Sequence, residues 1–319
     1  MKHLPPSLHV RTPLWESPTL SQILGTEVLL KMEAFQPAGS FKSRGMGAAC
    51  ADASTRGIRR VVCSSGGNAG LAVANAGRKL GLEVTIVVPQ TTSARAKDLI
   101  ARENAQVIVH GSAWDDAHAY ATQLAEETGS AYVHPFDDPV VWQGHSTMID
   151  ELAQDGVKPG MIVVSVGGGG LMCGVVEGLH RVGWGDVPVL AVETEGAASF
   201  AGAVRAGELI TLDAIRSIAV TLGAKRVTPR ALELTAQHEI IPWLVSDRQA
   251  IAACLRFADD HRVLVEPACG AALAAGYDRA EPLAEFTVSS AQREPVVFIV
   301  CGGAAVNREM LAKWDREVS

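Results

Sequence analysis

Residues 161–182 read MIVVSVGGGGLMCGVVEGLHRV, an apolar run followed by four glycines and a helical pattern. The apolar run is continuous rather than alternating, which is typical of a strand buried on both faces of a parallel sheet. The glycines permit a tight turn, and the helical pattern begins at Leu171. Ligands of open α/β sheets bind at the carboxyl ends of the strands. This stretch therefore predicts an α/β fold and a candidate binding site at the glycine turn.

The same alternation of strand and helix extends over most of the chain. Apolar runs recur at residues 59–64, 84–89, 106–110, 189–193 and 296–301, and helical patterns occupy residues 68–80, 93–104, 114–128 and 247–261. This rhythm predicts open, doubly wound parallel sheets. Two more of the apolar runs end in glycine turns, at Gly66-Gly67 and at Gly302-Gly303. Three turns are thus candidate walls of a site.

Composition and charge exclude several classes of protein. Of the 319 residues 48% are apolar and 20% are charged, and the formal net charge is −7. Neither a nucleic acid nor a membrane is an expected partner, because anionic surfaces require a concentrated positive patch. Residues 1–6 lack the apolar core of a signal peptide, and the run at 161–176 is too short to span a bilayer. We therefore expect a cytoplasmic protein.

The six cysteines form no metal-binding or disulfide pattern. They are scattered along the chain without a CxxC pair or a Cys/His ligand spacing. In a chain of this size, that distribution favours buried thiols in a reducing compartment over a zinc site or a disulfide frame. Five of them are interpreted as small apolar core residues. Cys301 is considered separately, because it ends a strand beside a glycine turn.

The turn Gly167-Gly168-Gly169-Gly170 allows two ligand interpretations. Glycines let backbone N–H groups approach an anion, and the following helix adds a favourable dipole, so the turn suits a phosphate. A dinucleotide is the alternative, because Glu193 stands about where a ribose-binding acid is expected. The G-x-G-x-x-G spacing fails, however, because Met172 or Cys173 occupies the third glycine position. We favour the phosphate over the dinucleotide and over a purely structural turn.

A lysine stands in a second candidate segment, Gly39-Ser40-Phe41-Lys42-Ser43-Arg44-Gly45. A lysine in a short polar segment is usually a solvated surface residue. Here it follows a strand-like run at residues 28–32 and a turn signal at residues 36–39. A lysine whose pKa is lowered by burial can form an imine and later act as a base. Phe41 could face the flat ring of a cofactor.

The loop Ser64-Ser65-Gly66-Gly67-Asn68-Ala69-Gly70 also joins an apolar run to a helical pattern. Ser65 could simply cap the helix. Alternatively, its hydroxyl, the backbone N–H groups and the Asn68 amide could bind a carboxylate and a phenolic oxygen. The local sequence favours neither interpretation over the other.

Taken together, these segments resemble the fold type II family of pyridoxal-phosphate enzymes, and within it the L-serine dehydratase/L-threonine deaminase branch, which includes serine dehydratase-like proteins. The resemblance runs over nearly the whole chain. It extends to Pro135-Phe136-Asp137-Asp138-Pro139, Leu264-Val265-Glu266-Pro267-Ala268-Cys269-Gly270-Ala271-Ala272 and Val300-Cys301-Gly302-Gly303. The implied α/β architecture, similar to that of tryptophan synthase β, has two open doubly wound sheets with the cofactor in the cleft between them. Residues 1–33 and 139–319 would form the large phosphate-binding domain, and residues 34–138 the small domain with the lysine.

The resemblance also implies roles for matched residues. Lys42 corresponds to the Schiff-base lysine, Phe41 to the residue against one face of the pyridine ring, and Asn68 to the partner of the 3-hydroxyl. The phosphate would be bound by the backbone N–H groups of Gly167, Gly168, Gly169, Gly170 and Leu171, and Cys301 would face the pyridine nitrogen. The substrate carboxylate would be received by Ser65, Gly66 and Ala69. A monovalent cation, expected to be potassium, would be held by Gly167, Glu193, Ala197, Ser199, Leu222 and Ala224.

Two positions depart from the family pattern. Gly66 stands where many relatives have alanine, so we expect a looser carboxylate loop and an altered activity or substrate preference. Thr221 stands where close relatives carry an alanine against the second face of the ring, and its hydroxyl could change how the ring is held.

The activity implied by the resemblance is β-elimination. L-Serine would give pyruvate and ammonia, L-threonine would give 2-oxobutyrate, and Lys42 would remove the α-proton as general base. A thiol at the pyridine nitrogen leaves the ring a poorer electron sink than an aspartate would, which favours elimination over transamination. The alternatives are a β-replacement enzyme such as a cysteine synthase, a serine racemase or plain threonine dehydratase, and a non-catalytic protein that kept the fold. A homodimer is expected by similarity.

Overall fold

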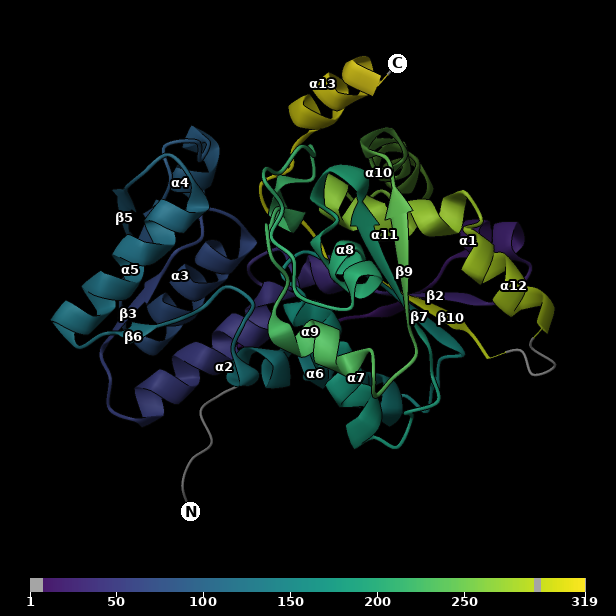
Figure 1. The fold of residues 1–319 in the computed structure, drawn as a ribbon, viewed down its shortest axis with the longest axis horizontal. Coiled ribbons are helices and arrows are strands. Elements are labelled where there is room, and N and C mark those ends of the chain that lie inside the picture. Colours follow the sequence, from purple (N-terminus) through teal and green to yellow (C-terminus); the bar gives the residue numbers. More distant parts are fainter. Residues whose placement is uncertain (1–7, 290–293, 319) are drawn as a thin grey trace. The chain divides into compact units, whose positions relative to one another are not determined.

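The computed structural model describes residues 8–289 and 294–318, which fall into two compact units (Figure 1). Unit 1 contains Gln36–His145 together with the described residues up to Val10, and unit 2 contains Arg11–Phe35 and the described residues from Ser146 onward. Residues 1–6, considered above for a signal peptide, lie outside the described residues. Within the described ranges, no helix is both long and apolar enough to cross a membrane.

Unit 1 is built on a four-stranded parallel sheet. Its strand order is β5-β4-β3-β6, with β3 at Arg60–Cys63, β4 at Glu83–Val88, β5 at Gln106–Val109 and β6 at Ala131–Tyr132. Its helices are α2 (Lys42–Thr55), α3 (Asn68–Leu80), α4 (Ala94–Ala101), α5 (Trp114–Thr128) and the start of α6 (Pro139–Gln154). Each strand follows a helix of the expected length, as the β–α alternation of the sequence predicts.

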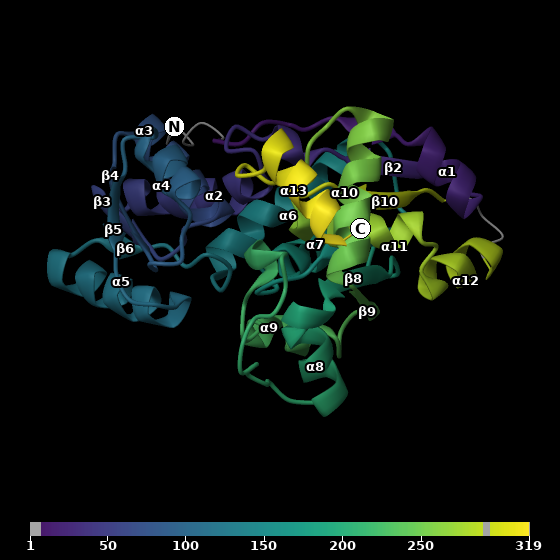
Figure 2. The same cartoon turned by 90° about the horizontal axis from the view of Figure 1, so that it is seen from above.

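Both faces of the unit 1 sheet are covered by helices (Figure 2). Successive strand side chains point to opposite faces. Accordingly, Val61 and Cys63 belong to the core that contains residues of α2 and α3, whereas Val62 joins Ala117 and Ala121 of α5. Fully burying one such aliphatic side chain contributes about 1.5–3 kcal/mol. The continuous apolar runs are therefore explained by burial on two faces, and the doubly wound prediction is confirmed here.

Unit 2 contains a six-stranded sheet in the order β1-β2-β10-β7-β8-β9. The strands are β1 (Leu14–Glu16), β2 (Val28–Lys31), β7 (Met161–Ser165), β8 (Val189–Thr194), β9 (Ile240–Val245) and β10 (Val296–Ile299). All neighbouring strands are parallel except β1, which pairs with β2 in the antiparallel direction at the edge.

The unit 2 helices include α1 (Pro18–Leu24), α7 (Gly170–Arg181), α8 (Ser199–Ala206), α9 (Pro229–Leu234), α10 (Asp247–His261), α11 (Pro267–Tyr277), α12 (Glu281–Ser289) and α13 (Arg308–Val318). Helices α10 and α11 lie on one side of the sheet, and α7 and α9 lie on the other (Figure 1). Of the 3₁₀ turns in the described residues, η1 (Glu33–Phe35) follows β2, η2 (Glu195–Ala197) lies between β8 and α8, and η3 (Val220–Leu222) lies between α8 and α9.

Local chemistry sets many of these boundaries. Helix α10 begins where predicted, because the Ser246 hydroxyl accepts a hydrogen bond from the Gln249 N–H while the Gln249 side-chain oxygen accepts one from the Ser246 N–H. Strand β9 was not predicted. It is only partly buried and contains Pro242, which lacks an N–H group and is tolerated here because β9 is an edge strand.

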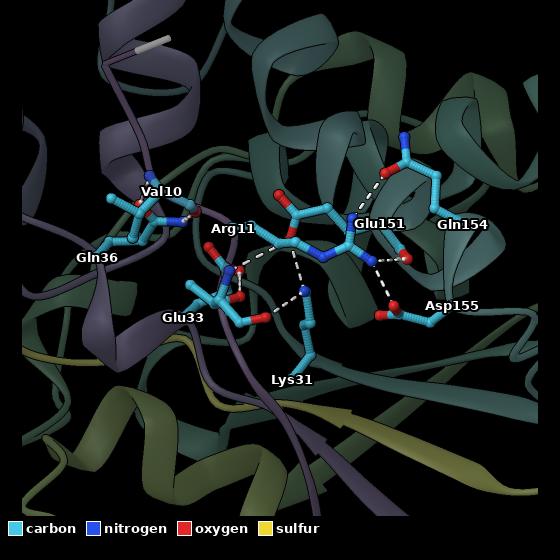
Figure 3. A network of polar contacts seen from close by, with 9 residues as sticks. Val10, Arg11, Lys31, Glu33, Gln36, Glu151, Gln154 and Asp155 are labelled. Atoms are coloured by element: carbon cyan, nitrogen blue, oxygen red, sulfur yellow. Dashed lines mark hydrogen bonds and ion pairs between the residues drawn. The ribbon is translucent and has the colours of Figure 1, made fainter.

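A buried ion pair lies within unit 2 (Figure 3). The Lys31 side chain is fully buried, and its Nζ donates to Glu151 Oε2 at 2.5 Å and to the Thr12 carbonyl at 2.8 Å. The Thr12 hydroxyl in turn donates to Glu33 Oε1 at 2.6 Å. A buried charge is tolerated only when it is paired and hydrogen-bonded. This network therefore connects β2, η1 and α6 to the segment that precedes β1.

Candidate active site

Lys42 is the first residue of α2. The preceding turn is closed by a hydrogen bond from the Gly39 N–H to the Gln36 carbonyl, and Gly39 has a φ of +72°, a left-handed conformation that favours glycine. Lys42 is half-buried, and its Nζ donates to the Pro135 carbonyl at 2.5 Å. The same nitrogen lies 4.9 Å from the centroid of the Phe41 ring. Lys42 is therefore held in place by partners, unlike an ordinary solvated lysine.

A histidine that the sequence analysis did not single out lies behind Phe41. The ring of His145 is fully buried, and its centroid lies 4.8 Å from that of Phe41. Burial, followed by the positive charges of Lys42 and Arg44, holds the pKa of His145 well below its usual range, so the imidazole is neutral. Gly45 makes room for it, because a Cβ there would lie 2.6 Å from His145 Cε1.

The Ser65 loop joins β3 to α3, and its turn depends on glycine. Ser65 Oγ accepts a hydrogen bond from the Gly67 N–H at 3.3 Å, immediately before the helix begins at Asn68. It therefore closes the turn, while the cap position of α3 is taken by Gly67. At Gly70 a Cβ would lie 1.8 Å from the Ser65 carbonyl oxygen, so only glycine fits this position.

Asn68 and Ala69 are the first two residues of α3. The first four N–H groups of an α-helix have no partner within the helix, and the helix dipole favours an anion at this end. Ala69 is buried, whereas Ser65, Gly66 and Asn68 are half-buried. All the predicted unit 1 residues thus gather at the carboxyl end of its sheet, where β3 and β6 end.

Gly66 is packed against Thr92. A Cβ on Gly66 would lie 2.6 Å from both Cγ2 and Oγ1 of Thr92. The Thr92 side chain therefore occupies the space that a methyl group on residue 66 would take. Because Thr92 fills the space beside Gly66, this contact argues against the looser loop that the missing methyl group predicts.

In unit 2 the glycine turn connects β7 to α7. A Cβ on Gly167 would lie 3.0 Å from Leu222 Cα, and Gly169 has a φ of +92° and would place a Cβ 2.9 Å from Ala231 Cβ. Gly170 begins α7, and Leu171 is buried. The Gly168 carbonyl accepts a hydrogen bond from the Thr228 N–H at 3.0 Å. The turn is thus held from outside by backbone contacts at the amino-terminal end of a helix, which is a suitable environment for a phosphate.

Glu193 stands near the end of β8, next to the strand that carries the glycine turn. Its carboxylate accepts hydrogen bonds from the Phe200 N–H at 2.9 Å and the Ala201 N–H at 2.7 Å. Burial nevertheless raises the pKa of Glu193 to about 7. The hydroxyl of Ser199 is also buried and makes no hydrogen bond in the structure. When ionised, this carboxylate together with the hydroxyl oxygen of Ser199 is chemically suited to a cation.

The other predicted cation ligands lie on two 3₁₀ turns and the segment after them. Ala197 ends η2 and Leu222 ends η3, and both are buried. The Ala224 N–H donates to the Leu222 carbonyl at 2.7 Å. The structure thus places Leu222 next to Gly167. It also places Ser199 next to Glu193.

Cys301 lies two residues after the end of β10 and is buried. A hydrogen bond with the Cys269 thiol, followed by burial, holds the pKa of Cys301 well above its usual range. Cys301 is therefore a neutral thiol. All six cysteines are buried free thiols, as predicted. Thr221, on η3, donates its hydroxyl to Glu266 Oε1 at 2.7 Å.

The residues present fit pyridoxal phosphate. Unit 1 presents a primary amine for an aldehyde, an aromatic ring and a side-chain amide, from Lys42, Phe41 and Asn68. Unit 2 presents a glycine turn, in which an added Cβ would lie tightly against the Leu222 backbone at Gly167 and against side chains at Gly169, and a neutral thiol at Cys301. This set of donors matches the aldehyde, ring, phosphate and ring nitrogen of the cofactor.

Comparisons with known proteins agree with this chemistry. Residues 7–302 match the family described as "Pyridoxal-phosphate dependent enzyme". The chain is 47% identical over 310 residues to the L-serine dehydratase/L-threonine deaminase of Mus musculus, with 96% of this chain and 94% of that protein covered. It is 49% identical over 306 residues to the serine dehydratase-like protein of Mus musculus, with 95% and 93% covered.

Solved structures show the same similarity. The crystal structure of a fungal L-serine ammonia-lyase from Rhizomucor miehei superposes with a TM-score of 0.92 at 39% identity, covering 98% of this chain and 100% of that chain. Maize serine racemase superposes with a TM-score of 0.86 at 27% identity, covering 97% and 92%. These matches leave the dinucleotide interpretation without support. The chain belongs to the pyridoxal-phosphate-dependent enzymes, with the fold type II architecture.

Proposed function

We propose that this protein is a pyridoxal-phosphate-dependent ammonia-lyase that converts L-serine to pyruvate and ammonia, and L-threonine to 2-oxobutyrate and ammonia. The observation that carries the proposal is the placement of Lys42: its amine lies at the carboxyl ends of β3 and β6, bonded to the Pro135 carbonyl and beside the Phe41 ring. The similarity to L-serine dehydratases over almost the whole chain supports it.

When bound, the cofactor supplies an electron sink for the bond that breaks at the substrate α-carbon. Lys42 would hold the cofactor and, once displaced by the substrate amine, its free amine would remove the α-proton. The β-hydroxyl would leave with a proton as water, and the released enamine would then take up one water and hydrolyse to the keto acid and ammonia. Asn68 would orient the 3-hydroxyl, and the N–H groups from Gly167 to Leu171 would bind the phosphate.

Two further groups set the reaction and the substrate. Cys301 would face the ring nitrogen with a neutral thiol, since its pKa is well above its usual range. A neutral thiol withdraws less charge than an acidic partner, which supports elimination over transamination. The substrate carboxylate would be received by the loop of Ser65, Gly66 and Ala69, at the amino-terminal end of α3.

A monovalent cation, potassium by similarity, is a further part of the proposal. The buried Glu193 carboxylate and the unused Ser199 hydroxyl support it. Gly167, Ala197, Leu222 and Ala224 would complete the ligand set. We also propose that the two units are the small and large lobes of the enzyme, that it works as a homodimer, and that it is cytoplasmic. Sedimentation analysis of the purified protein tests the dimer.

The proposed activity is tested by a steady-state comparison of L-serine, L-threonine and D-serine, with keto acid as the product measured, in potassium and in sodium. We expect keto acid from the two L-amino acids, and loss of activity by at least about 10³-fold in Lys42→Arg, because an arginine forms no imine and is a poor base. Lys313→Arg, at an exposed lysine on α13, is the matched control. No keto acid from any substrate would refute the proposal, and a product formed only with added sulfide would favour β-replacement.

A further inference from the structure

The Lys42 amine is bonded to a carbonyl whose own peptide segment is short and tightly held. The Val133 N–H donates to the Val62 carbonyl at 2.8 Å, which extends the pairing of β6 with β3 by one residue. Helix α6 begins at Pro139. Five residues, His134 to Asp138, therefore turn the chain between strand and helix, and Pro135 is one of them. Because proline has no N–H group, Pro135 contributes no backbone hydrogen bond of its own to fix its carbonyl.

His134 supplies the missing constraint. Its Nδ1 accepts hydrogen bonds from the Phe136 N–H at 3.2 Å and the Asp137 N–H at 2.7 Å. A backbone N–H can only donate, so Nδ1 must carry the lone pair and the ring proton must be on Nε2. Asparagine and aspartate side chains close turns in this way, by accepting from N–H groups ahead in the chain.

The electrostatic environment keeps this acceptor available. Burial, followed by the neighbouring His118 and Lys42, lowers the pKa of His134 to about 3. The ring is therefore neutral across the range in which an enzyme works. The His134 ring also meets the Phe136 ring edge to face, with centroids 4.6 Å apart. From the other side, Trp142 Nε1 donates to the Phe136 carbonyl at 2.6 Å.

We propose that His134 is a positioning residue for Lys42: it locks the turn so that the Pro135 carbonyl meets the Lys42 amine at a fixed place. The carbonyl bonds more strongly to an ammonium than to a neutral amine. It would therefore stabilise Lys42 in the state that follows uptake of the α-proton, when the proton has moved from the substrate α-carbon to Nζ. Only this catalytic consequence rests on the proposed function, because the hold on Lys42 is a property of the chain itself.

The test measures the pKa of the Lys42 ammonium in the cofactor-free protein, by NMR titration after reductive ¹³C-methylation, with the Lys42 signal assigned by its loss in Lys42→Arg. Two amide substitutions are compared. His134→Asn places an oxygen where Nδ1 lies, whereas the longer side chain of His134→Gln places its amide where Nε2 lies. We expect the wild-type pKa in His134→Asn and a pKa lower by about one unit in His134→Gln, the shift produced by losing a hydrogen bond to a charged group.

His110→Gln, at an exposed histidine of the same unit, is the control and leaves the Lys42 pKa unchanged. In the cofactor-loaded enzyme we expect His134→Gln to lower kcat about tenfold with little change in KM, and His134→Asn to restore it. Equal Lys42 pKa values in the Asn and Gln variants would overturn the inference, whether both match the wild type or both fall. That result would not affect the proposed function, because the keto acid assay and the Lys42→Arg variant test the function separately.

Discussion

At the scale of single residues, the site depends on pairs whose members lie far apart in the sequence. Gly66 and Thr92 share one space, and His145 fits only because position 45 is a glycine. Thr221 donates its hydroxyl to Glu266, so the hydroxyl that distinguishes it from an alanine already has a partner within unit 2. Such pairs predict coupled rather than independent effects of substitution.

The Gly66 and Thr92 pair gives a direct test. We expect Gly66→Ala to lower the free energy of unfolding by about 1–3 kcal/mol, the usual result of inserting a methyl group into filled space. It should also raise KM for L-serine, because the loop that receives the carboxylate is displaced. Adding Thr92→Ala should recover most of both losses. Thermal unfolding and steady-state kinetics of the two single variants and the double variant complete the cycle, and additive effects would contradict the coupling.

At the scale of elements, the predicted chemistry lies where a strand ends and a helix or turn begins. β3 leads into the Ser65 loop, β7 into the glycine turn, and β8 into the segment from Glu193 to Ser199. Within each of the two sheets, the carboxyl ends of the parallel strands lie on one edge, and the first N–H groups of the following helices are available there. The cation proposal belongs to this scale, because it joins the end of β8 to the start of α8.

Glu193 predicts how stability depends on pH and on potassium. Its pKa is raised from an ordinary value near 4.5 to about 7, so the folded protein holds this proton more tightly than the unfolded chain does. Without the cation, Glu193 should therefore make stability fall as pH rises from about 4.5 to about 7, by up to about 3 kcal/mol.

Potassium should offset that loss, because it stabilises the ionised carboxylate. We expect potassium to raise Tm more at pH 8 than at pH 5 in cofactor-free protein. Glu193→Gln should lose both the pH-dependent component and the potassium response. Thermal unfolding across pH in potassium and in tetramethylammonium, which is too large for such a site, measures both. An unchanged potassium response in Glu193→Gln would show that the cation binds elsewhere.

At the scale of the whole molecule, polar contacts join segments that are distant in sequence. Lys31 on β2 and Glu151 on α6 form a buried ion pair that also holds the Thr12 backbone (Figure 3). Arg11 adds hydrogen bonds to Gln154 and Asp155 nearer the surface. Breaking a buried pair by removing one partner typically costs about 3–5 kcal/mol, because the remaining charge has no compensation.

We therefore expect Lys31→Met to lower the stability of the protein by about 3–5 kcal/mol, and Lys31→Met/Glu151→Met to be less destabilised than the single variant. Arg60→Met is the control, since the Arg60–Glu83 pair is exposed and should contribute at most about 1 kcal/mol. Chemical denaturation of the three variants provides the comparison. A Lys31→Met protein as stable as the control variant would contradict a structural role for this network.

Patterns short enough to read along the chain determined the fold class and several site residues. Strands β3, β4, β7, β8 and β10 were predicted from continuous apolar runs that are largely buried, and edge strand β5 from an apolar run that is only partly buried. Within the turn at 167–170, glycine is favoured by a close approach at Gly167 and by a positive φ at Gly169. The roles of Lys42, Asn68 and Cys301 were inferred from the resemblance to a known family and remain predictions. Edge strand β9 was missed, since Pro242 and partial burial remove the signal on which strand prediction depends.

Only the tertiary structure decided which groups act on those residues. The Pro135 carbonyl that holds Lys42, the His134 ring that holds the turn, and the Thr92 side chain that fills the space beside Gly66 carry no sequence signature. Their effect comes from backbone groups and from side chains tens of residues away, brought close by the pairing of β3 with β4 and β6. Lys42 could therefore be proposed from the sequence, whereas the contacts that hold its amine follow from packing alone.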